Sequence, residues 1–230
     1  MFPLVFALSF SACGWRQKAS ETPPTVQPFA GEESKSAIPF QTREPENFQA
    51  DFVVTTGAVE NKTFTARRNG DYRFDYNLSG NLKISNIKTA DGKSFLIVDS
   101  KKIYAENSGA AAEQISNDSA DFPTNQWLNA KADAEFTNLG AENGLTKYRV
   151  NLDASRRSET IVFVDENIKL PVRQEFYSTG DGERSLFYTV EMRNFKLRAD
   201  ADLFEIPADY KRVSLENLRA VVKKEGFGEQ

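Results

Sequence analysis

The chain has 230 residues, 40% of them hydrophobic and 27% charged, and its net charge of −4 comes from both signs interspersed along the sequence. This length suits one domain with extensions, and the lack of a basic face argues against a nucleic-acid partner. The sequence contains no histidine and one cysteine, which excludes Ser-His-Asp and Cys-His catalysis, histidine-dependent metal sites and an intramolecular disulfide.

The N-terminus is a short apolar run, Met1–Ala12, followed by the single cysteine, Cys13. Ser11 and Ala12 before a cysteine resemble a bacterial lipobox, which implies a signal peptide over 1–12 and lipidation of Cys13 as a membrane anchor. The run is too short to span a membrane as a helix. No Lys or Arg precedes it, and Phe10 stands where a lipobox usually has Leu. A buried N-terminal cysteine is therefore the alternative.

The residues after the cysteine indicate a tether. Among lipoproteins of bacteria with two membranes, Asp after the cysteine marks inner-membrane retention, so Gly14 implies an outer-membrane protein facing the periplasm. Pro, Ser and charged residues dominate the following stretch without any period, and such a composition cannot bury enough apolar surface to fold. We expect residues 13–47 to be a lipidated N-terminus and disordered tether, with Ile38-Pro39-Phe40 docking on the domain edge.

Strict alternation of apolar and polar residues begins at Phe48 and predicts a series of short strands. Asn69-Gly70 between two alternating runs is a strong hairpin signal, because both turn residues readily adopt positive φ. Asp91-Gly92 marks a second hairpin. Short turns imply antiparallel neighbours. The predicted strands cover residues 48–54, 62–67, 71–78, 82–88, 94–99 and 103–104.

Residues 107–134 change character. Gly109–Ile115 is helix-prone, and Thr124 can cap a short helix that carries Trp127 and Leu128 on one side. The stretch therefore predicts a helical insertion between two sets of strands, with an ordinary connection as the alternative.

A second antiparallel meander follows. Residues 135–139 and 145–152 flank Asn143-Gly144, another hairpin signal. Glu159–Pro207 then predicts three long strands closed by a short terminal strand, the last long strand alternating from Leu186 to Met192. After Pro207, Ser214 is expected to cap a helix over residues 215–224 that ends at Gly226.

The stretch Glu159–Pro207 is also where the chain resembles a known family. Leu170-Pro171-Val172 after a short turn, and the ending Asp202-Leu203-Phe204-Glu205-Ile206-Pro207, are similar to the C-terminal half of the LolA/LolB superfamily of bacterial envelope proteins, which includes lipoprotein carriers, acceptors and RseB-like sensors. The resemblance covers roughly residues 48–213. It implies a mainly β fold with few helices, an incomplete antiparallel β-barrel (half-barrel) with a helical lid. It divides the chain into a LolA-like domain over 48–213 and a C-terminal helix and tail over 214–230.

Motifs for catalysis are weak. Ser85–Lys88 matches an S-x-x-K motif, but it lies in a predicted strand and its partner motifs are missing. Asp165-Glu166-Asn167 resembles a calcium loop by composition only. The sequence predicts no enzyme, metal or cofactor.

Inward-pointing apolar residues on several strands, together with the lid segment, predict an apolar ligand site. The expected function is an envelope carrier or acceptor that shields acyl chains of lipids or lipoproteins, and the alternative is an RseB-type module that binds a protein partner. The same side chains could instead simply pack against helices. The predicted lining residues are Phe52, Val54, Tyr72, Phe74, Tyr76, Trp127, Leu128, Tyr148, Val150, Phe176, Leu186, Tyr188, Val190 and Met192.

Overall fold

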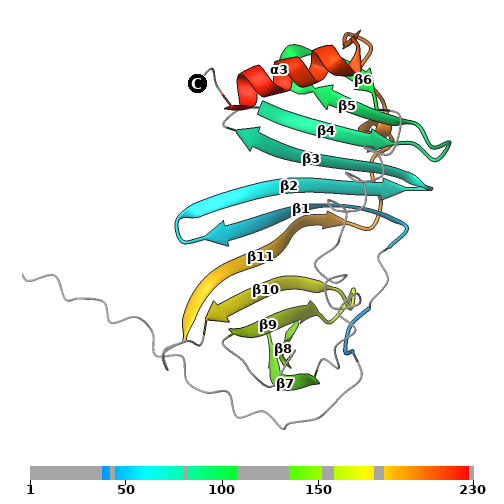
Figure 1. Ribbon diagram of the computed structural model, residues 1–230. Coiled ribbons are helices and arrows are strands. Elements are labelled where there is room, and N and C mark those ends of the chain that lie inside the picture. Colours follow the sequence, from blue (N-terminus) through cyan, green and yellow to red (C-terminus); the bar gives the residue numbers. More distant parts are fainter. Residues whose placement is uncertain are drawn as a thin grey trace, which may run out of the picture.

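The computed structural model describes residues 38–41, 45–79, 82–107, 135–151, 158–178 and 184–227. Cys13, Trp127, Leu128 and most of the expected helical insertion lie outside these residues. The described residues form one open, curved, largely antiparallel twelve-stranded sheet with a single α-helix near the C-terminus, as the mainly β prediction requires (Figure 1).

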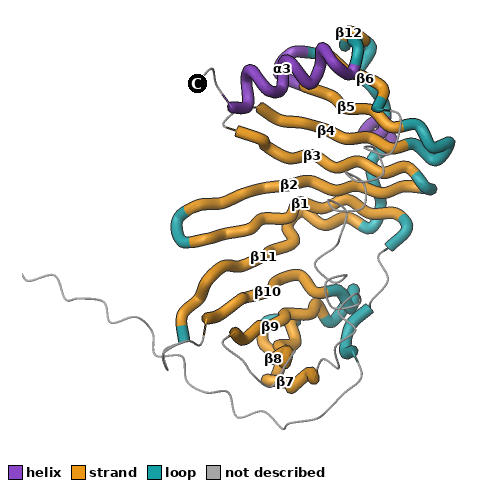
Figure 2. The backbone as a smooth tube through the Cα atoms, in the orientation of Figure 1, coloured by secondary structure: helices purple, strands orange, loops and turns teal. Residues whose placement is uncertain are grey.

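The strand order is β12-β6-β5-β4-β3-β2-β1-β11-β10-β9-β8-β7. Two meanders, β1 to β6 and β7 to β11, thus lie side by side and are joined by the antiparallel pair of β1 and β11 (Figure 2). The strands are β1 Asn47–Thr56, β2 Val59–Arg68, β3 Asp71–Ser79, β4 Leu82–Lys88, β5 Ser94–Val98, β6 Ile103–Glu106, β7 Glu135–Glu142, β8 Leu145–Asn151, β9 Ser158–Asp165, β10 Pro171–Ser178, β11 Ser185–Lys196 and β12 Lys211–Arg212.

The predicted hairpin turns are confirmed by their backbone angles. Asn69 and Gly70 have φ of 52° and 92°, and Asn143 and Gly144 have φ of 53° and 77°. Gly92, in the turn between β4 and β5, has φ of 86°. Residues that tolerate positive φ therefore set the turns that fix the register of the flanking strands.

The segment just before β1 docks on the far end of the sheet, as expected for Ile38-Pro39-Phe40. Phe40 is buried and packs edge-to-face on Phe136 of β7, with ring centroids 5.6 Å apart. The backbone N–H of Gln41 donates to the carbonyl of Lys169 at 2.8 Å. Residues 38–41 are thus part of the packed domain.

The predicted short terminal strand within Glu159–Pro207 is wrong. The chain leaves the sheet after β11, forms a 3₁₀ turn, η3 (Ala201–Phe204), and reaches the opposite edge, where β12 pairs in parallel with β6. The side chains of Asn47 and Gln49 on β1 accept hydrogen bonds from the backbone N–H groups of Ala199 and Asp200. These two side chains hold the segment after β11 in place of backbone pairing between strands. Such pairing with β11 is not possible, because β11 already has a partner strand on each side.

The C-terminal helix α3 (Leu215–Phe227) begins as predicted, since the Ser214 hydroxyl accepts a hydrogen bond from the Asn217 N–H at 3.2 Å. Leu218 is buried against residues of β4 and β5. The helix does not end at Gly226, as the sequence suggested, but continues to Phe227. A Cβ at Gly226 would lie 2.7 Å from Cδ2 of Leu78, so glycine lets the helix pack closely on Leu78 without a shift of that side chain.

Gly70→Val should lower the free energy of unfolding by at least about 1 kcal/mol, because a β-branched residue resists positive φ. A Cβ at this position would also lie 3.1 Å from Cβ of Ala90. Urea denaturation of the variant and the wild type measures the change, and an unchanged midpoint would contradict this account of the turn.

Candidate functional site

The strand register brings side chains from distant parts of the chain onto one face of the sheet. Directly opposite residues in neighbouring strands point to the same side. One continuous row crosses five strands, from β1 through β11, β10 and β9 to β8, and consists of Val54, Val190, Gln174, Val162 and Tyr148. A second row, on the other half of the sheet, consists of Tyr76, Thr63, Phe52 and Met192.

We call the side that carries these rows the apolar face. The same alternation and pairing place eleven of the predicted lining residues on it: Phe52, Val54, Tyr72, Phe74, Tyr76, Tyr148, Val150, Phe176, Tyr188, Val190 and Met192.

Leu186 does not follow the predicted alternation. The register between β10 and β11 shifts between Phe176 and Tyr177, so that Tyr188 lies opposite Phe176 whereas Leu186 lies opposite Tyr177. A bulge of this kind moves the residues before it to the other side of the strand. Leu186 therefore points away from the apolar face and is exposed. Trp127 and Leu128, the lid candidates, lie outside the described residues.

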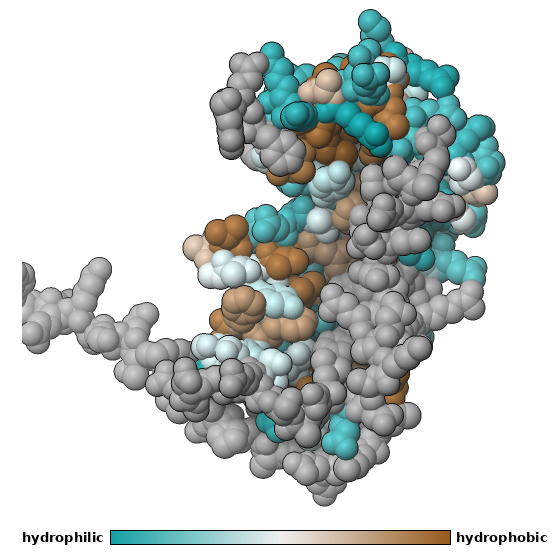
Figure 3. Space-filling view, in the orientation of Figure 1, coloured by the Kyte–Doolittle hydropathy of each residue, from teal (hydrophilic) through white to brown (hydrophobic). Residues whose placement is uncertain are grey.

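Described elements cover the apolar face at its two ends and over part of β1, where Leu170 packs on Phe48, Ala50 and Phe52. At one end α3 packs on β4, β5 and β6 through Leu218. At the other end Phe40 packs on β7, β8 and β9. Figure 3 shows the face hollowed below α3, with hydrophobic side chains in the hollow.

Half-buried aromatic pairs line the middle of the face. Phe176 and Tyr188 stack with centroids 4.2 Å apart and planes 15° apart, and Phe74 and Tyr76 stack at 5.6 Å. Offset stacks of this kind keep large apolar surfaces in place. The middle of the face therefore presents an ordered aromatic surface rather than a set of mobile side chains.

The phenol groups on this face report a low-polarity environment. Burial raises the pKa of Tyr76, Tyr148 and Tyr188 above the ordinary value, and for Tyr148 the charge of Glu166 adds to the effect. Desolvation disfavours the charged phenolate, so all three phenols stay protonated and neutral at neutral pH.

One polar side chain interrupts the row of apolar residues. Gln174 lies between Val190 and Val162 and is 1% exposed. Neither its Oε1 nor its Nε2 has a hydrogen-bond partner among the described residues. The alternation along β10 places Gln174 on the same face as Phe176, although Gln174 was not among the predicted lining residues. A polar residue at an inward position of an otherwise apolar alternation was the available signal.

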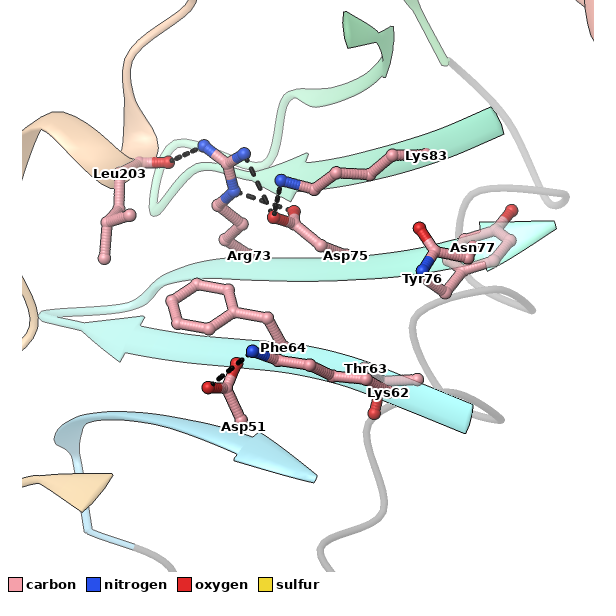
Figure 4. Close-up of a pocket in the computed structure, with 10 residues that line it drawn as sticks. All are labelled: Asp51, Lys62, Thr63, Phe64, Arg73, Asp75, Tyr76, Asn77, Lys83 and Leu203. Carbon is pink, nitrogen blue, oxygen red and sulfur yellow. Dashed lines mark hydrogen bonds and ion pairs between the residues drawn. The ribbon is translucent and has the colours of Figure 1, made fainter. Parts of the chain in front are cut away.

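The opposite side, which we call the outer face, is charged. A cavity of about 420 Å³ lies there, between β1 to β4 and η3, and Figure 4 shows the side chains that line it. Arg73 binds the buried Asp75 through two hydrogen bonds of 2.8 and 3.1 Å and donates to the carbonyl of Leu203 at 2.9 Å. Lys83 pairs with Asp75 at 2.9 Å, and Lys62 pairs with Asp51 at 2.9 Å.

Every charged group that lines this cavity thus has an ionic partner within it. The Arg73 bond to Leu203 fixes η3 to β3, so the cluster is explained as the attachment of the segment after β11. Within the described residues no group of acidic or cysteine side chains could hold a metal ion, and no helix is long and apolar enough to cross a membrane.

No protein-family model matches the chain, and no curated protein matches it by sequence. Solved structures with a similar fold include MucB, with 13% identity over 72% of this chain and a TM-score of 0.44, and MucB in complex with MucA(peri), with 15% identity over 73% and a TM-score of 0.41. The chain spans 59% and 56% of the length of these two chains. A LolA superfamily protein from Nitrosomonas europaea is 13% identical over 73% of this chain and 93% of its own, with a TM-score of 0.29.

Arg73→Leu should lower the free energy of unfolding by about 2 kcal/mol or more, because it leaves the buried carboxylate of Asp75 with Lys83 alone and frees η3. Arg212→Leu is the matched control. Arg212 pairs with Glu106 at an exposed position, and exposed pairs contribute little. Urea denaturation should move the midpoint of the first variant only, and equal midpoints would exclude the proposed attachment.

Proposed function

We propose that the protein binds an acyl chain of a lipid or lipoprotein on the apolar face and acts as a carrier or acceptor without catalysis. The observation that supports this is the register, which gathers aromatic and aliphatic side chains from six strands on one hollowed side of the sheet. Among the described elements, α3 and Phe40 cover the two ends of that side, and Leu170 covers part of β1. An open sheet that does not fill its own concave side leaves room for an apolar ligand.

The free energy gained by burying a hydrocarbon chain is large enough for such a site to bind one. Each CH₂ group moved from water into an apolar site contributes about 0.8 kcal/mol. A sixteen-carbon chain gains roughly 10 kcal/mol gross, reduced by the loss of ligand freedom. The stacked pair of Phe176 and Tyr188 lies at the centre of the face and offers a flat surface to such a chain.

The chemistry of the face favours binding over catalysis. The phenols of Tyr76 and Tyr188 on this face have a pKa raised by burial, so they are poor nucleophiles and poor bases at neutral pH. The charged residues of the outer face pair with one another on the other side of the sheet.

The cellular setting that we propose is the bacterial envelope. The proposed partners are acyl chains and, through Cys13, the membrane itself. The lipobox-like sequence before Cys13 supports a lipid anchor, and Gly14 supports the outer membrane facing the periplasm. A protein partner in the envelope is the second candidate, and the binding experiment below separates the two.

A charge on the apolar face should abolish ligand binding. In Tyr188→Asp or Phe74→Asp an acyl chain would have to desolvate a carboxylate, so the affinity for a fluorescent fatty-acid probe should fall at least tenfold. The full chain carrying Cys13→Ser is used, so that no attached acyl chain competes. Circular dichroism checks that the strand content is unchanged.

Leu197→Asp is the matched control, since Leu197 is an exposed apolar residue beyond the end of β11 and its variant should bind the probe as the wild type does. If the wild type takes up no probe in a saturable manner, or if Tyr188→Asp binds it equally well, the acyl-chain proposal fails. Co-purification of a lipid-free complex with an envelope protein would then favour the second candidate.

Cys13→Ser should leave an unprocessed precursor that no longer incorporates radiolabelled palmitate, because the thiol is the acylation site of a lipobox. Electrophoretic mobility and label incorporation in the bacterial host measure the change. Equal labelling of variant and wild type would remove the anchor from the proposal.

A further inference from the structure

Exposed apolar side chains gather at one end of the strands. The exposed fraction is 65% for Phe187, 60% for Val59, 51% for Leu186 and 36% for Leu78. Val59 begins β2, Leu186 and Phe187 lie at the start of β11, and Leu78 is the last residue but one of β3. Because β1 and β11, β1 and β2, and β2 and β3 are antiparallel pairs, these residues lie at the same end of the sheet (Figure 1). We call these four residues the open rim.

The apolar face becomes more exposed toward the open rim. On β1, among the residues of this face, Phe48 is fully buried, Val54 is half-buried and Thr56 is exposed. On β3 the order is the same, from the buried Tyr72 to the exposed Leu78. The face is therefore accessible from the rim, where its side chains already meet solvent.

The open rim is continuous with the middle of the apolar face. Phe187 contacts Tyr188 edge-to-face, with ring centroids 5.5 Å apart, and Tyr188 stacks on Phe176 at 4.2 Å. Val59 lies opposite Thr56 in the last pair of β1 and β2. A line of contacting aromatic rings thus leads from the exposed rim to the middle of the face.

The rim offers little charge to a partner. Residues 55–59 and 185–189 contain no charged residue, in a chain of which 27% is charged. Glu60 and Arg184, the charged residues next to these two segments, each form an ion pair within the protein. Contact at the rim is therefore driven by burial of apolar surface rather than by attraction between charges.

A lipid bilayer fits these features better than a protein does. A stable protein interface buries about 800 Å² on each partner, and four partly exposed side chains cannot supply that area. A fluid bilayer needs no matching shape. Each apolar side chain that enters it gains free energy in proportion to the area that it buries.

We infer that the open rim docks on a lipid bilayer, as a second membrane contact separate from Cys13, and that acyl chains pass there between the bilayer and the apolar face. The docking stands on the exposed rim alone, whereas the exchange of acyl chains rests on the proposed function. Because the membrane meets the strand ends rather than one face, Leu186 contributes although it points away from the apolar face.

Site-specific labelling tests the docking. Cys13 is the only cysteine, so Cys13→Ser combined with Phe187→Cys allows an environment-sensitive fluorophore to be attached at the rim of the full chain. Its emission should shift to shorter wavelength when phosphatidylcholine vesicles are added. The shift should be similar when the vesicles also contain phosphatidylglycerol, because apolar contact drives the docking.

Leu197→Cys with the same label is the matched control. Leu197 is 60% exposed but lies beyond the other end of β11, so its label should show no shift. The absence of a shift at Phe187, or an equal shift at Leu197, would overturn the docking. A shift that appears without vesicles as the protein concentration rises would also overturn it, since the rim would then be a contact between copies of the chain.

Transfer kinetics test the exchange of acyl chains. The transfer of a fluorescent fatty acid from the full chain carrying Cys13→Ser to phosphatidylcholine vesicles should become faster as the vesicle concentration rises, because contact rather than release into water limits it. Val59→Asp should slow this transfer about tenfold, because its carboxylate opposes insertion into the bilayer. The equilibrium affinity for the fatty acid in solution should stay the same, and Leu197→Asp should transfer as the wild type does.

The outcomes separate this inference from the proposed function. If the fatty acid binds but its transfer does not depend on vesicle concentration, or Val59→Asp transfers it as fast as the wild type, exchange at the rim is overturned while acyl-chain binding stands. If the fatty acid shows no saturable binding, the proposed function fails and the exchange fails with it, whereas a shift of the label at Phe187 alone still supports the docking.

Discussion

The pairing of β1 with β11 is the contact on which the rest of the structure depends. These strands lie 129 residues apart, counted from the end of β1 at Thr56 to the start of β11 at Ser185, and each is also held by its own meander on the other side. Without their pairing the two meanders would be separate sheets with two additional open edges. With it, Val54 lies opposite Val190 and Phe52 opposite Met192, so the apolar face runs without a break from one meander into the other.

The irregularity in this pair shapes the sheet. The register shifts between Gln49 and Asp51, and Asn194 in the facing strand has a positive φ of 54°. Its side-chain N–H donates to Oδ2 of Asp51 at 2.6 Å, which holds the irregular residue in place. A bulge bends and twists the sheet locally, and here it lies at the point where β11 ends and the chain turns onto the outer face. The same irregularity thus directs the chain after β11 onto the outer face, where Arg73 holds η3.

Local signals in the sequence predicted the local structure, and long-range packing decided the rest. The Asn-Gly and Asp-Gly turns, the alternation along β3 and the Ser214 cap each depend on a few neighbouring residues, and these predictions are confirmed. The pairing of β1 with β11 depends on residues far apart in the chain and carries no local mark. Leu186 was misplaced because a bulge changes which side a residue faces without changing the alternation of residue types. Gly226 was taken as a helix end because its close contact with Leu78 is visible only in three dimensions.

The fold pairs buried polar side chains on both faces of the sheet, and Gln174 is an exception among the described residues. On the outer face Asn47, Gln49, Asp51 and Asp75 are bound by backbone N–H groups or by cationic side chains. The fold can therefore satisfy buried polar groups where they stabilise it. On the apolar face the Ser94 hydroxyl donates to Oδ1 of the buried Asn86 at 3.3 Å, whereas neither amide atom of Gln174 has a hydrogen-bond partner among the described residues. An amide that is left unpaired in this way costs stability.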